Sequence, residues 1–335
     1  IKSIVGVFCF LFDVFSMHMT NIPFADKATI AHSLDYLRLV EGLDKAFRAN
    51  TATTPQRHHH DYQGTASGTE STLLLMPSWE QQGKLGIKLV TVSPDNHQLQ
   101  LPAIHGLYVL FDSVTGVPQM LMDAQELTVR RTAAASALAS KYLSREDSKT
   151  LLMVGTGALA THLIRAHASV RPIKKVMIWG RNQQKADALA DSMQQEPFVV
   201  SVVPTIAEGL AEADIVSSAT LSNTPLILGD QVVEGQHIDL VGSYKKDMRE
   251  ADDSTIAKSR VFVDTATAQV ESGDLYMPLE QGLIAPDDIQ GDLFKLCARQ
   301  QFARRSDEEV TLFKSVGHAM EDLVAARLVW EAHSG

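Results

Sequence analysis

A glycine-rich turn near the middle of the chain holds the residues best suited to chemistry. The segment LLMVGTGALA has the pattern G-x-G-x-x-A at Gly155, Gly157 and Ala160. The first glycine permits a tight turn, the second lets the backbone approach a pyrophosphate, and the alanine allows a helix to pack closely on a strand. The free N–H groups that begin such a helix bind phosphate, so the pattern predicts a dinucleotide site; a bare structural turn is the alternative. The residues assigned to the cofactor here are Gly155, Thr156, Gly157, Ala158 and Leu159.

The end of the following strand indicates which dinucleotide is preferred. NAD sites commonly place Asp or Glu there to hold the ribose 2′-hydroxyl. This chain has Trp179-Gly180-Arg181-Asn182 instead, and Arg181 and Lys185 can face a 2′-phosphate. We therefore expect NADPH to be preferred, with NADH possible, and assign Arg181, Asn182 and Lys185 to the cofactor. Thr220 ends the apolar run DIVSSAT, at the strand edge where such folds bind ligands, and is assigned to the nicotinamide side.

The elements that must position these residues alternate regularly. Short apolar runs at 150–155, 174–180, 198–204, 214–220, 237–242 and 260–264 are separated by helical patterns. Such runs are typical of parallel strands buried on both faces and joined by crossover helices. The sequence therefore predicts an α/β fold with a Rossmann-type doubly wound parallel sheet.

The remainder of the chain has a different order of expected helices and strands. A helix is expected over residues 29–47, a polar stretch over 51–68, strands at 73–79, 84–92 and 105–112, and an alanine-rich helix over 123–143. The apolar spacing of residues 311–330 predicts one long helix that returns to the first lobe. We thus expect a second, α+β domain for substrate binding and dimerisation, formed by residues 17–130 and 310–335, beside an NADP-binding domain at 131–309.

Composition narrows the class of protein. The 335 residues are 45% hydrophobic and 21% charged, which is ordinary for a soluble fold. The net charge of −10 gives no general attraction to nucleic acid, so we expect neither nucleic acid nor a membrane as partner. Cys9 and Cys297 cannot form a disulfide framework and have no zinc-binding spacing, which fits a cytoplasmic protein.

The first residues need separate treatment. Residues 4–15 are almost wholly apolar but too few to span a bilayer, and no small-residue cleavage site follows them. We expect residues 1–16 to be a non-native or disordered extension before a start at Met17 or Met19. A secretory signal and a packed N-terminal strand are the alternatives.

Several further motifs resemble the ornithine cyclodeaminase/mu-crystallin family. They are LTVRRTAAASALASKYL, MVGTGALATHLIRAH, VMIWGRNQQKADALA, ADIVSSAT, IDLVGSYKKDMREADD and TLFKSVGHAMEDLVAA, and the likeness runs in order from about Ile22 to the C-terminus. The resemblance implies a two-domain homodimer that binds NAD(P) in its second domain. It also implies an enzyme of the class that holds cyclodeaminases, alanine dehydrogenases and reductases of cyclic imino acids.

Three basic residues match those the family uses around a substrate carboxylate and its reacting nitrogen. They are Arg57, Lys88 and Arg131. A guanidinium fork suits a carboxylate, and an ammonium can donate a proton to an amine nitrogen. We assign all three to catalysis, and Arg131 to the cofactor site as well; the alternative is that they are half-exposed basic residues. His105 lies in a segment that resembles one near the family's pocket and is a candidate proton relay, or an internally hydrogen-bonded histidine.

One departure from the family pattern favours a particular reaction. Cyclodeaminases carry an aspartate where this chain has Tyr244, and a phenol with a pKa of about 10 cannot replace that base. The sequence therefore favours NADPH-dependent reduction of Δ1-pyrroline-2-carboxylate to L-proline, and of Δ1-piperideine-2-carboxylate to L-pipecolate. Ornithine cyclodeamination, alanine dehydrogenation and non-catalytic binding of mu-crystallin type are the alternatives. Adjacent histidines such as His58-His59-His60 do not readily converge on one ion, so we expect no metal site.

Overall fold

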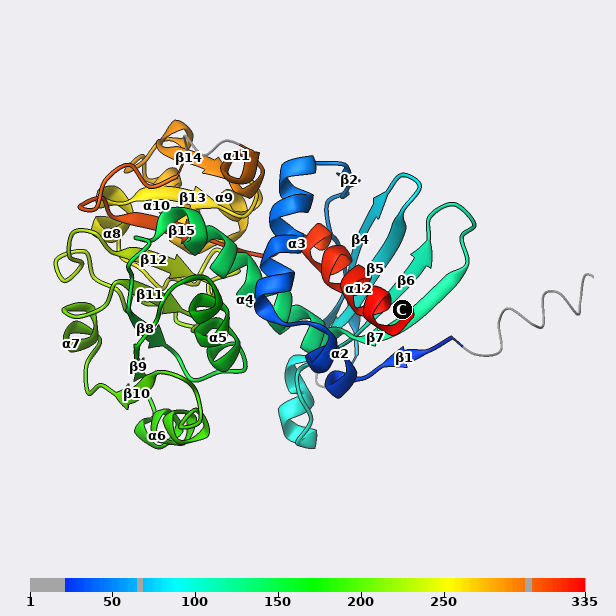
Figure 1. The fold of residues 1–335 in the computed structure, drawn as a ribbon, viewed down its shortest axis with the longest axis horizontal. Coiled ribbons are helices and arrows are strands. Elements are labelled where there is room, and N and C mark those ends of the chain that lie inside the picture. The colour runs from blue at the N-terminus through cyan, green and yellow to red at the C-terminus, as the bar shows by residue number, and fades with distance from the viewer. Residues whose placement is uncertain (1–21, 65–68, 299–302, 335) are drawn as a thin grey trace, which may run out of the picture. The chain divides into compact units, whose positions relative to one another are not determined.

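The computed structural model describes residues 22–64, 69–298 and 303–334 and divides into two compact units (Figure 1). The first unit holds the segments up to Ser33, Ala52–Leu127 and from Ala326 onward, and the second holds Leu34–Thr51 and Thr128–Ala325. The expectations about residues 1–16, Cys9 and a start at Met17 or Met19 lie outside the described residues.

The second unit is built on a parallel sheet. Within the described residues the sheet has eight strands in the order β10-β9-β8-β11-β12-β15-β13-β14. The strands are β8 (Thr150–Val154), β9 (Lys175–Trp179), β10 (Val199–Val202), β11 (Ile215–Ser218), β12 (His237–Leu240), β13 (Arg260–Val263), β14 (Ile289–Asp292) and β15 (Thr311–Lys314). Strands β11, β12, β13 and β15 are buried at every position, as parallel strands covered on both faces must be. The predicted Rossmann-type sheet is confirmed.

Strand order creates a crevice beside β8. The chain runs outward from β8 to β9 and β10, then returns to place β11 on the other side of β8. Ligands of open α/β sheets bind at the carboxyl ends of the strands where the order reverses in this way. The predicted glycine turn and Thr220 follow β8 and β11 directly, so the topology brings both to this crevice.

The prediction of one long helix over residues 311–330 is wrong in its first part. Residues Thr311–Lys314 form β15, which lies between β12 and β13, and α12 begins only at Ala319 and runs to Ser334. Gly317, with a φ of 85°, separates the two. Leu312, Val316 and Met320 are four residues apart, so the apolar spacing fits a helical period although residues 311–314 form a strand.

The expected helix over residues 29–47 is two helices. Helix α2 (Lys27–Ser33) ends before Asp35, whose side chain accepts a hydrogen bond of 2.9 Å from the backbone N–H of Arg38 and begins α3 (Tyr36–Ala49). The expected alanine-rich helix is α4 (Ala124–Leu143). The other helices are α5 (Ala160–Val170), α6 (Gln183–Ser192), α7 (Ile206–Leu210), α8 (Asp253–Lys258), α9 (Ala268–Glu271), α10 (Gly273–Glu280) and α11 (Leu293–Ala298), with 3₁₀ turns η1 (Pro94–Leu99) and η2 (Pro286–Asp288).

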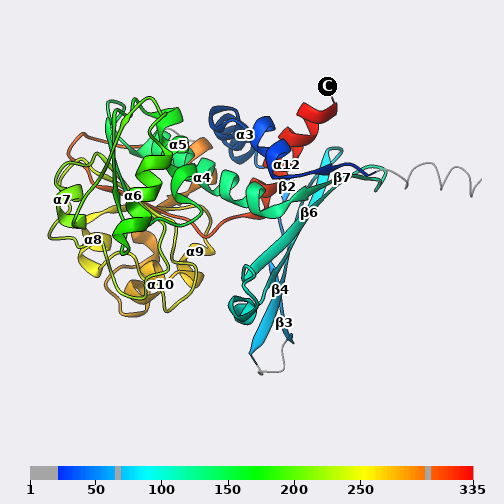
Figure 2. The same ribbon diagram turned by 90° about the horizontal axis from the view of Figure 1, so that it is seen from below.

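The first unit contains a largely antiparallel sheet. In the described residues it has seven strands, ordered β1-β7-β6-β5-β4-β2 with β3 also paired to β4 (Figure 2). The strands are β1 (Phe24–Ala25), β2 (Ala52–Thr53), β3 (His58–Gln63), β4 (Glu70–Glu80), β5 (Lys84–Val92), β6 (Ile104–Asp112) and β7 (Pro118–Asp123). Its inward face carries Met76, Tyr108, Leu110, Met120 and Met122, all of them buried. Across the described residues, no helix is both long and apolar enough to cross a membrane.

Candidate cofactor and substrate site

The glycine turn after β8 has the geometry that its pattern predicts. Gly155 has a φ of 113°, and its N–H donates to the carbonyl of Trp179 at 2.9 Å. A Cβ atom on Gly155 would lie 2.7 Å from the carbonyl oxygen of Ala219, at the end of β11. Both the backbone angle and this close approach therefore require glycine at position 155. The contacts of Gly155 with Trp179 and Ala219 also bring the ends of β8, β9 and β11 together.

The next residues of the turn leave room for a ligand. A Cβ on Gly157 would meet no atom within 4 Å, and both Gly157 and Ala158 are exposed. Ala160 is buried and begins α5, after Leu159 as N-cap. Leu159 carries no capping side chain, and the N–H of Ala160 donates to the carbonyl of Gly157 at 3.0 Å, so the N–H groups that follow it in the first turn of α5 are those that can bind a phosphate. The turn therefore fits a pyrophosphate.

The predicted selectivity residues lie beside this turn. A Cβ on Gly180 would lie 2.6 Å from the Cγ2 atom of Thr156, so the chain after β9 passes directly against the glycine turn. Arg181 and Lys185 follow and are exposed. Asn182 caps α6, because its side chain accepts a hydrogen bond of 3.1 Å from the N–H of Lys185. The structure thus assigns Asn182 a capping role that the sequence pattern did not identify.

Thr220 is held in place by a residue that the sequence pattern did not single out. Its N–H and its hydroxyl both donate to Oε1 of Glu250, at 2.7 and 2.8 Å. The same oxygen accepts from the Ser218 hydroxyl at 2.7 Å. Oε2 of Glu250 accepts from the N–H groups of Gly242 at 2.6 Å and Ser243 at 3.3 Å. One carboxylate therefore fixes the chain that follows both β11 and β12.

Glu250 is itself embedded in a buried charge cluster. Its backbone N–H donates to Oδ1 of Asp274 at 2.7 Å, and Nζ of Lys314 lies 3.4 Å from Oδ2 of Asp274. Burial raises the pKa of Glu250 to about 6, against the opposing effect of the Lys314 charge. The only sequence signal for Glu250 was its place in the family-like stretch GSYKKDMREADD. Tyr244 of that stretch is 47% exposed.

Arg131 is buried, with an exposed fraction of 5%, and is paired with two carboxylates. Its Nη1 donates to Oε2 of Glu321 at 2.7 Å, and its Nε donates to Oδ1 of Asp322 at 3.0 Å. Burial alone would lower the pKa of Arg131, but the two negative charges raise it above its ordinary value. A Cβ on Gly317 would lie 2.4 Å from Nη1, so the guanidinium packs directly against that glycine. Sequence spacing did not show these two acids, which are far away along the chain.

Arg130, next to Arg131, has a different environment. Its Nη1 donates to the carbonyl of Leu34 at 2.7 Å, and its guanidinium lies 5.4 Å from the ring centre of Tyr36. Consecutive helical residues point about 100° apart, so only one of the two can face Glu321 and Asp322. The choice of Arg131 over Arg130 stays a prediction, and the structure gives Arg130 contacts with the start of α3.

Arg57 and Lys88 lie at the same level of the first unit's sheet. Lys88, on β5, is 2% exposed and pairs with Met76 of β4. Arg57 is half-buried and precedes His58, which pairs with Leu75, the neighbour of Met76. The structure therefore brings these two predicted residues to one region of the sheet, on either side of β4.

His105 does not join them. Lys88 pairs directly with Tyr108 of β6, whereas His105 pairs with Thr91. Side chains alternate between faces along a strand, so His105, three residues from Tyr108, points to the face opposite Lys88. It is also exposed. The structure gives no support to a proton relay between His105 and Lys88.

His58, His59 and His60 are exposed on β3, and the described residues hold no cluster of three metal-binding side chains.

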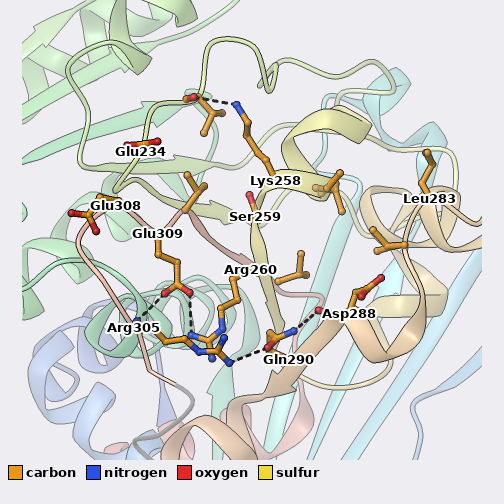
Figure 3. Close-up of a pocket in the computed structure, with 16 residues that line it drawn as sticks. Glu234, Lys258, Ser259, Arg260, Leu283, Asp288, Gln290, Arg305, Glu308 and Glu309 are labelled. Atoms are coloured by element: carbon orange, nitrogen blue, oxygen red, sulfur yellow. Dashed lines mark hydrogen bonds and ion pairs between the residues drawn. The ribbon is translucent and has the colours of Figure 1, made fainter.

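A cavity of about 720 Å³ opens elsewhere in the second unit (Figure 3). It lies at the amino end of β13, the edge of the sheet opposite to the glycine turn, and some of the charges that line it are paired with one another. The Glu309 carboxylate, for instance, accepts from the backbone N–H of Arg305 at 2.9 Å and lies 3.5 Å from Nη1 of Arg260. Its position separates it from the carboxyl ends of the strands, where the cofactor is expected to bind.

Comparison with known proteins agrees with the resemblance drawn from the motifs. The model of the ornithine cyclodeaminase/mu-crystallin family matches residues 24–335. The chain is 40% identical to a Δ1-pyrroline-2-carboxylate reductase of Colwellia psychrerythraea, over 90% of this chain and 96% of that protein.

Two solved structures share the fold. The Δ1-pyrroline-2-carboxylate reductase of Thermococcus litoralis, in complex with NADH and L-proline, has a TM-score of 0.86 and 31% identity, over 93% of this chain and 97% of that one. An archaeal alanine dehydrogenase dimer with bound NAD has a TM-score of 0.85 and 26% identity, over 93% and 96%. The family resemblance and the fold class predicted from the sequence are both confirmed.

Proposed function

Because the chain belongs to the ornithine cyclodeaminase/mu-crystallin family, we propose that it is a nicotinamide-dependent reductase of cyclic imino acids. The substrate is Δ1-pyrroline-2-carboxylate, which is reduced to L-proline, and the six-membered Δ1-piperideine-2-carboxylate is accepted as well. The observation that carries this proposal is the 40% identity, over nearly the whole chain, to a reductase of that name. A homodimer is proposed by analogy with the dimeric alanine dehydrogenase.

The second unit has the residues to hold the cofactor, which supplies the hydride. Thr156, Gly157, Ala158 and Leu159 would bind the pyrophosphate through backbone N–H groups just before α5, and Gly155, whose own N–H is bonded to Trp179, would form the turn that presents them. Thr220, fixed by Glu250, would lie at the nicotinamide side of the crevice. Its hydroxyl oxygen can still accept a hydrogen bond.

NADPH is the proposed cofactor of preference. Arg181 and Lys185 are exposed just after Gly180, which passes against the glycine turn, and no carboxylate occupies residues 179–186. A guanidinium can bind a 2′-phosphate through two parallel hydrogen bonds. Arg181→Ala should therefore lower kcat/KM for NADPH about tenfold or more and leave kcat/KM for NADH nearly unchanged, which makes NADH the internal control.

Basic residues supply the remaining chemistry. Arg57 and Arg131 would hold the substrate carboxylate, and Lys88 would give a proton to the imine nitrogen, directly or through water. Lys88 is almost fully buried, with an exposed fraction of 2%. Holding the reactants in position is the main source of the rate.

Initial rates with NADPH test the proposal directly. The two cyclic imines, pyruvate with ammonia, and L-ornithine with oxidised cofactor are compared by the absorbance of the reduced nicotinamide and by ammonia release. We expect turnover of the imines without added ammonia. Ammonia-dependent turnover of pyruvate would indicate an alanine dehydrogenase, ammonia release from ornithine a cyclodeaminase, and cofactor binding without any turnover a binding protein.

A further inference from the structure

Thr220, at the end of β11, can accept a hydrogen bond from a ligand but has no donor left to offer. A threonine has two donors, its backbone N–H and its hydroxyl. Both of those in Thr220 donate to Oε1 of Glu250, at 2.7 and 2.8 Å. The hydroxyl oxygen of Thr220 therefore faces any further group with its lone pairs alone.

The direction of the bond from the Thr220 hydroxyl is fixed by the other contacts of Glu250. Oε2 accepts from the backbone N–H groups of Gly242 and Ser243, and Oε1 accepts from the Ser218 hydroxyl as well as from Thr220. Five donors thus meet the roughly four lone-pair sites of one carboxylate, and backbone N–H groups can only donate. No lone pair is left for a proton on Glu250, so the carboxylate accepts and the Thr220 hydroxyl must donate to it.

The place of Thr220 in the crevice points to the part of a dinucleotide that it would meet. A Cβ on Gly155 would lie 3.2 Å from Cγ2 of Thr220, so Thr220 borders the glycine turn proposed to hold the pyrophosphate. The two halves of a dinucleotide extend in opposite directions from the pyrophosphate. The adenosine half would lie toward β9, which Arg181 follows, and the nicotinamide half toward β11, on the other side of β8.

The carboxamide of nicotinamide carries one group of each kind, an amino donor and a carbonyl acceptor. Its carbonyl oxygen would meet only lone pairs at Thr220, whereas its amino group would find an acceptor. We propose that Thr220 determines which ring substituent the site accepts: its hydroxyl oxygen binds the carboxamide amino group, and a cofactor without that N–H donor is selected against. This inference rests on the proposed function for the binding of a nicotinamide cofactor.

Cofactor analogues that change one side of the carboxamide test the inference by calorimetric titration of the wild-type protein at pH 8. The thionicotinamide analogue of NADP+ keeps the amino group and replaces the carbonyl oxygen with sulfur. The 3-acetylpyridine analogue keeps the carbonyl and replaces the amino group with methyl. We expect the thionicotinamide analogue to bind about as tightly as NADP+ and the acetylpyridine analogue about tenfold more weakly, because it leaves the Thr220 oxygen without a donor.

Variants of Thr220 assign this preference to its hydroxyl. Thr220→Val has nearly the same shape but no acceptor, so it should bind NADP+ about as weakly as the acetylpyridine analogue, whereas Thr220→Ser should keep the preference of wild type. Thr115→Val is the matched control, since it removes a hydroxyl that donates at 2.9 Å to another carboxylate, that of Asp112, in the exposed turn between β6 and β7. It should bind all three cofactors as wild type does. A merely structural role of Thr220 would instead weaken all three cofactors equally in Thr220→Val.

Nuclear magnetic resonance gives a second readout that needs no turnover. With NADP+ labelled with nitrogen-15 in its carboxamide, one of the two amide protons should shift downfield on binding to wild type and to Thr220→Ser, and less on binding to Thr220→Val. If Thr220→Val does not fold, the analogue series and this shift in wild type and Thr220→Ser decide the matter.

Two results would overturn the inference. One is equal affinity of wild type for NADP+ and its acetylpyridine analogue, and the other is a preference that persists in Thr220→Val. Either result leaves the proposed function standing. If neither NADP+ nor NAD+ binds to wild type, the proposed function fails, and the role of Thr220 fails with it.

Discussion

Glu250 and Glu321 are both fully buried acids of the second unit, yet they differ in how many donors surround them. The carboxylate of Glu250 accepts five hydrogen bonds, shared between its two oxygens. Glu321 accepts from Arg131 through one oxygen and lies next to a second acid, Asp322. Burial raises the pKa of both, to about 6 and about 7 respectively.

The comparison separates two uses of a buried acid. Donors on every lone pair favour the charged form and make Glu250 a fixed acceptor around which two loops are organised. An acid with few donors and a negative neighbour can change its protonation state with little rearrangement. The following four predictions test that distinction.

The largest effect should come from removing the cation beside Glu321. Arg131→Met removes a buried cation that both Glu321 and Asp322 contact, so we expect the free energy of unfolding to fall by about 3–5 kcal/mol in urea titrations at pH 8. Activity should be lost as well. Arg130→Met, at the adjacent position, should lower the free energy of unfolding much less. Equal losses in the two variants would show that the ion pairs of Arg131 with Glu321 and Asp322 do not determine its contribution to stability.

Glu250→Gln should have the next largest effect. An amide can accept through only one of its two atoms, so several of the donors around residue 250 would face an N–H group instead of an oxygen. We expect the free energy of unfolding to fall by about 1–3 kcal/mol and KM for NADPH to rise more than kcat falls, because Thr220 loses its support. An unchanged KM for NADPH would rule out Glu250 as a support of the cofactor crevice.

The pH dependence of stability distinguishes the two acids. Each has a higher pKa in the folded protein than the ordinary glutamate value of 4.5, so its contribution to stability is complete below pH 4.5 and is lost as the pH rises through the folded value. Between pH 6 and 7 the loss should come mainly from Glu321, with a slope of up to about 1.4 kcal/mol per pH unit. Urea titrations of wild type and Glu321→Gln over this range should differ by that slope; parallel curves would contradict it.

The smallest effect should come from removing a single donor to Glu250. Ser218→Ala removes the hydroxyl that donates at 2.7 Å and leaves four donors in place. We expect a loss of about 1 kcal/mol in the free energy of unfolding and a further rise in the pKa of Glu250. If Ser218→Ala lowered the free energy of unfolding as much as Glu250→Gln does, the Ser218 hydroxyl alone, rather than the five donors together, would account for the effect.

The sequence predicted the parallel sheet well because its signals are local. The turn at Gly155 and the apolar runs around it are contiguous patterns, and each maps to a strand or helix start. The polar segment at residues 58–63 gave no strand signal, because all six residues of β3 are exposed. β15 was missed because Leu312 is in helical register with Val316 and Met320, while Thr311 and Lys314 interrupt the apolar run that a buried strand usually shows.

The candidate site was predicted only where a single segment carries the chemistry. Arg131 could be named from its own helix, but its pairing with Glu321 and Asp322 joins positions about 190 residues apart. The same holds for Thr220 and Glu250. His105 illustrates the converse, because strand register, which the sequence did not give, turns it away from Lys88.

The position of β15 also sets an order of events during synthesis. Strands β12 and β13 are each paired with β15 rather than with each other, and β15 is the last strand of the chain to be made. A chain still on the ribosome before residue 314 can join β8 to β12 but has no strand with which to attach β13 and β14. The nucleotide half can thus form early, whereas Lys314, Gly317 and Glu321 reach their partners only when translation is nearly complete.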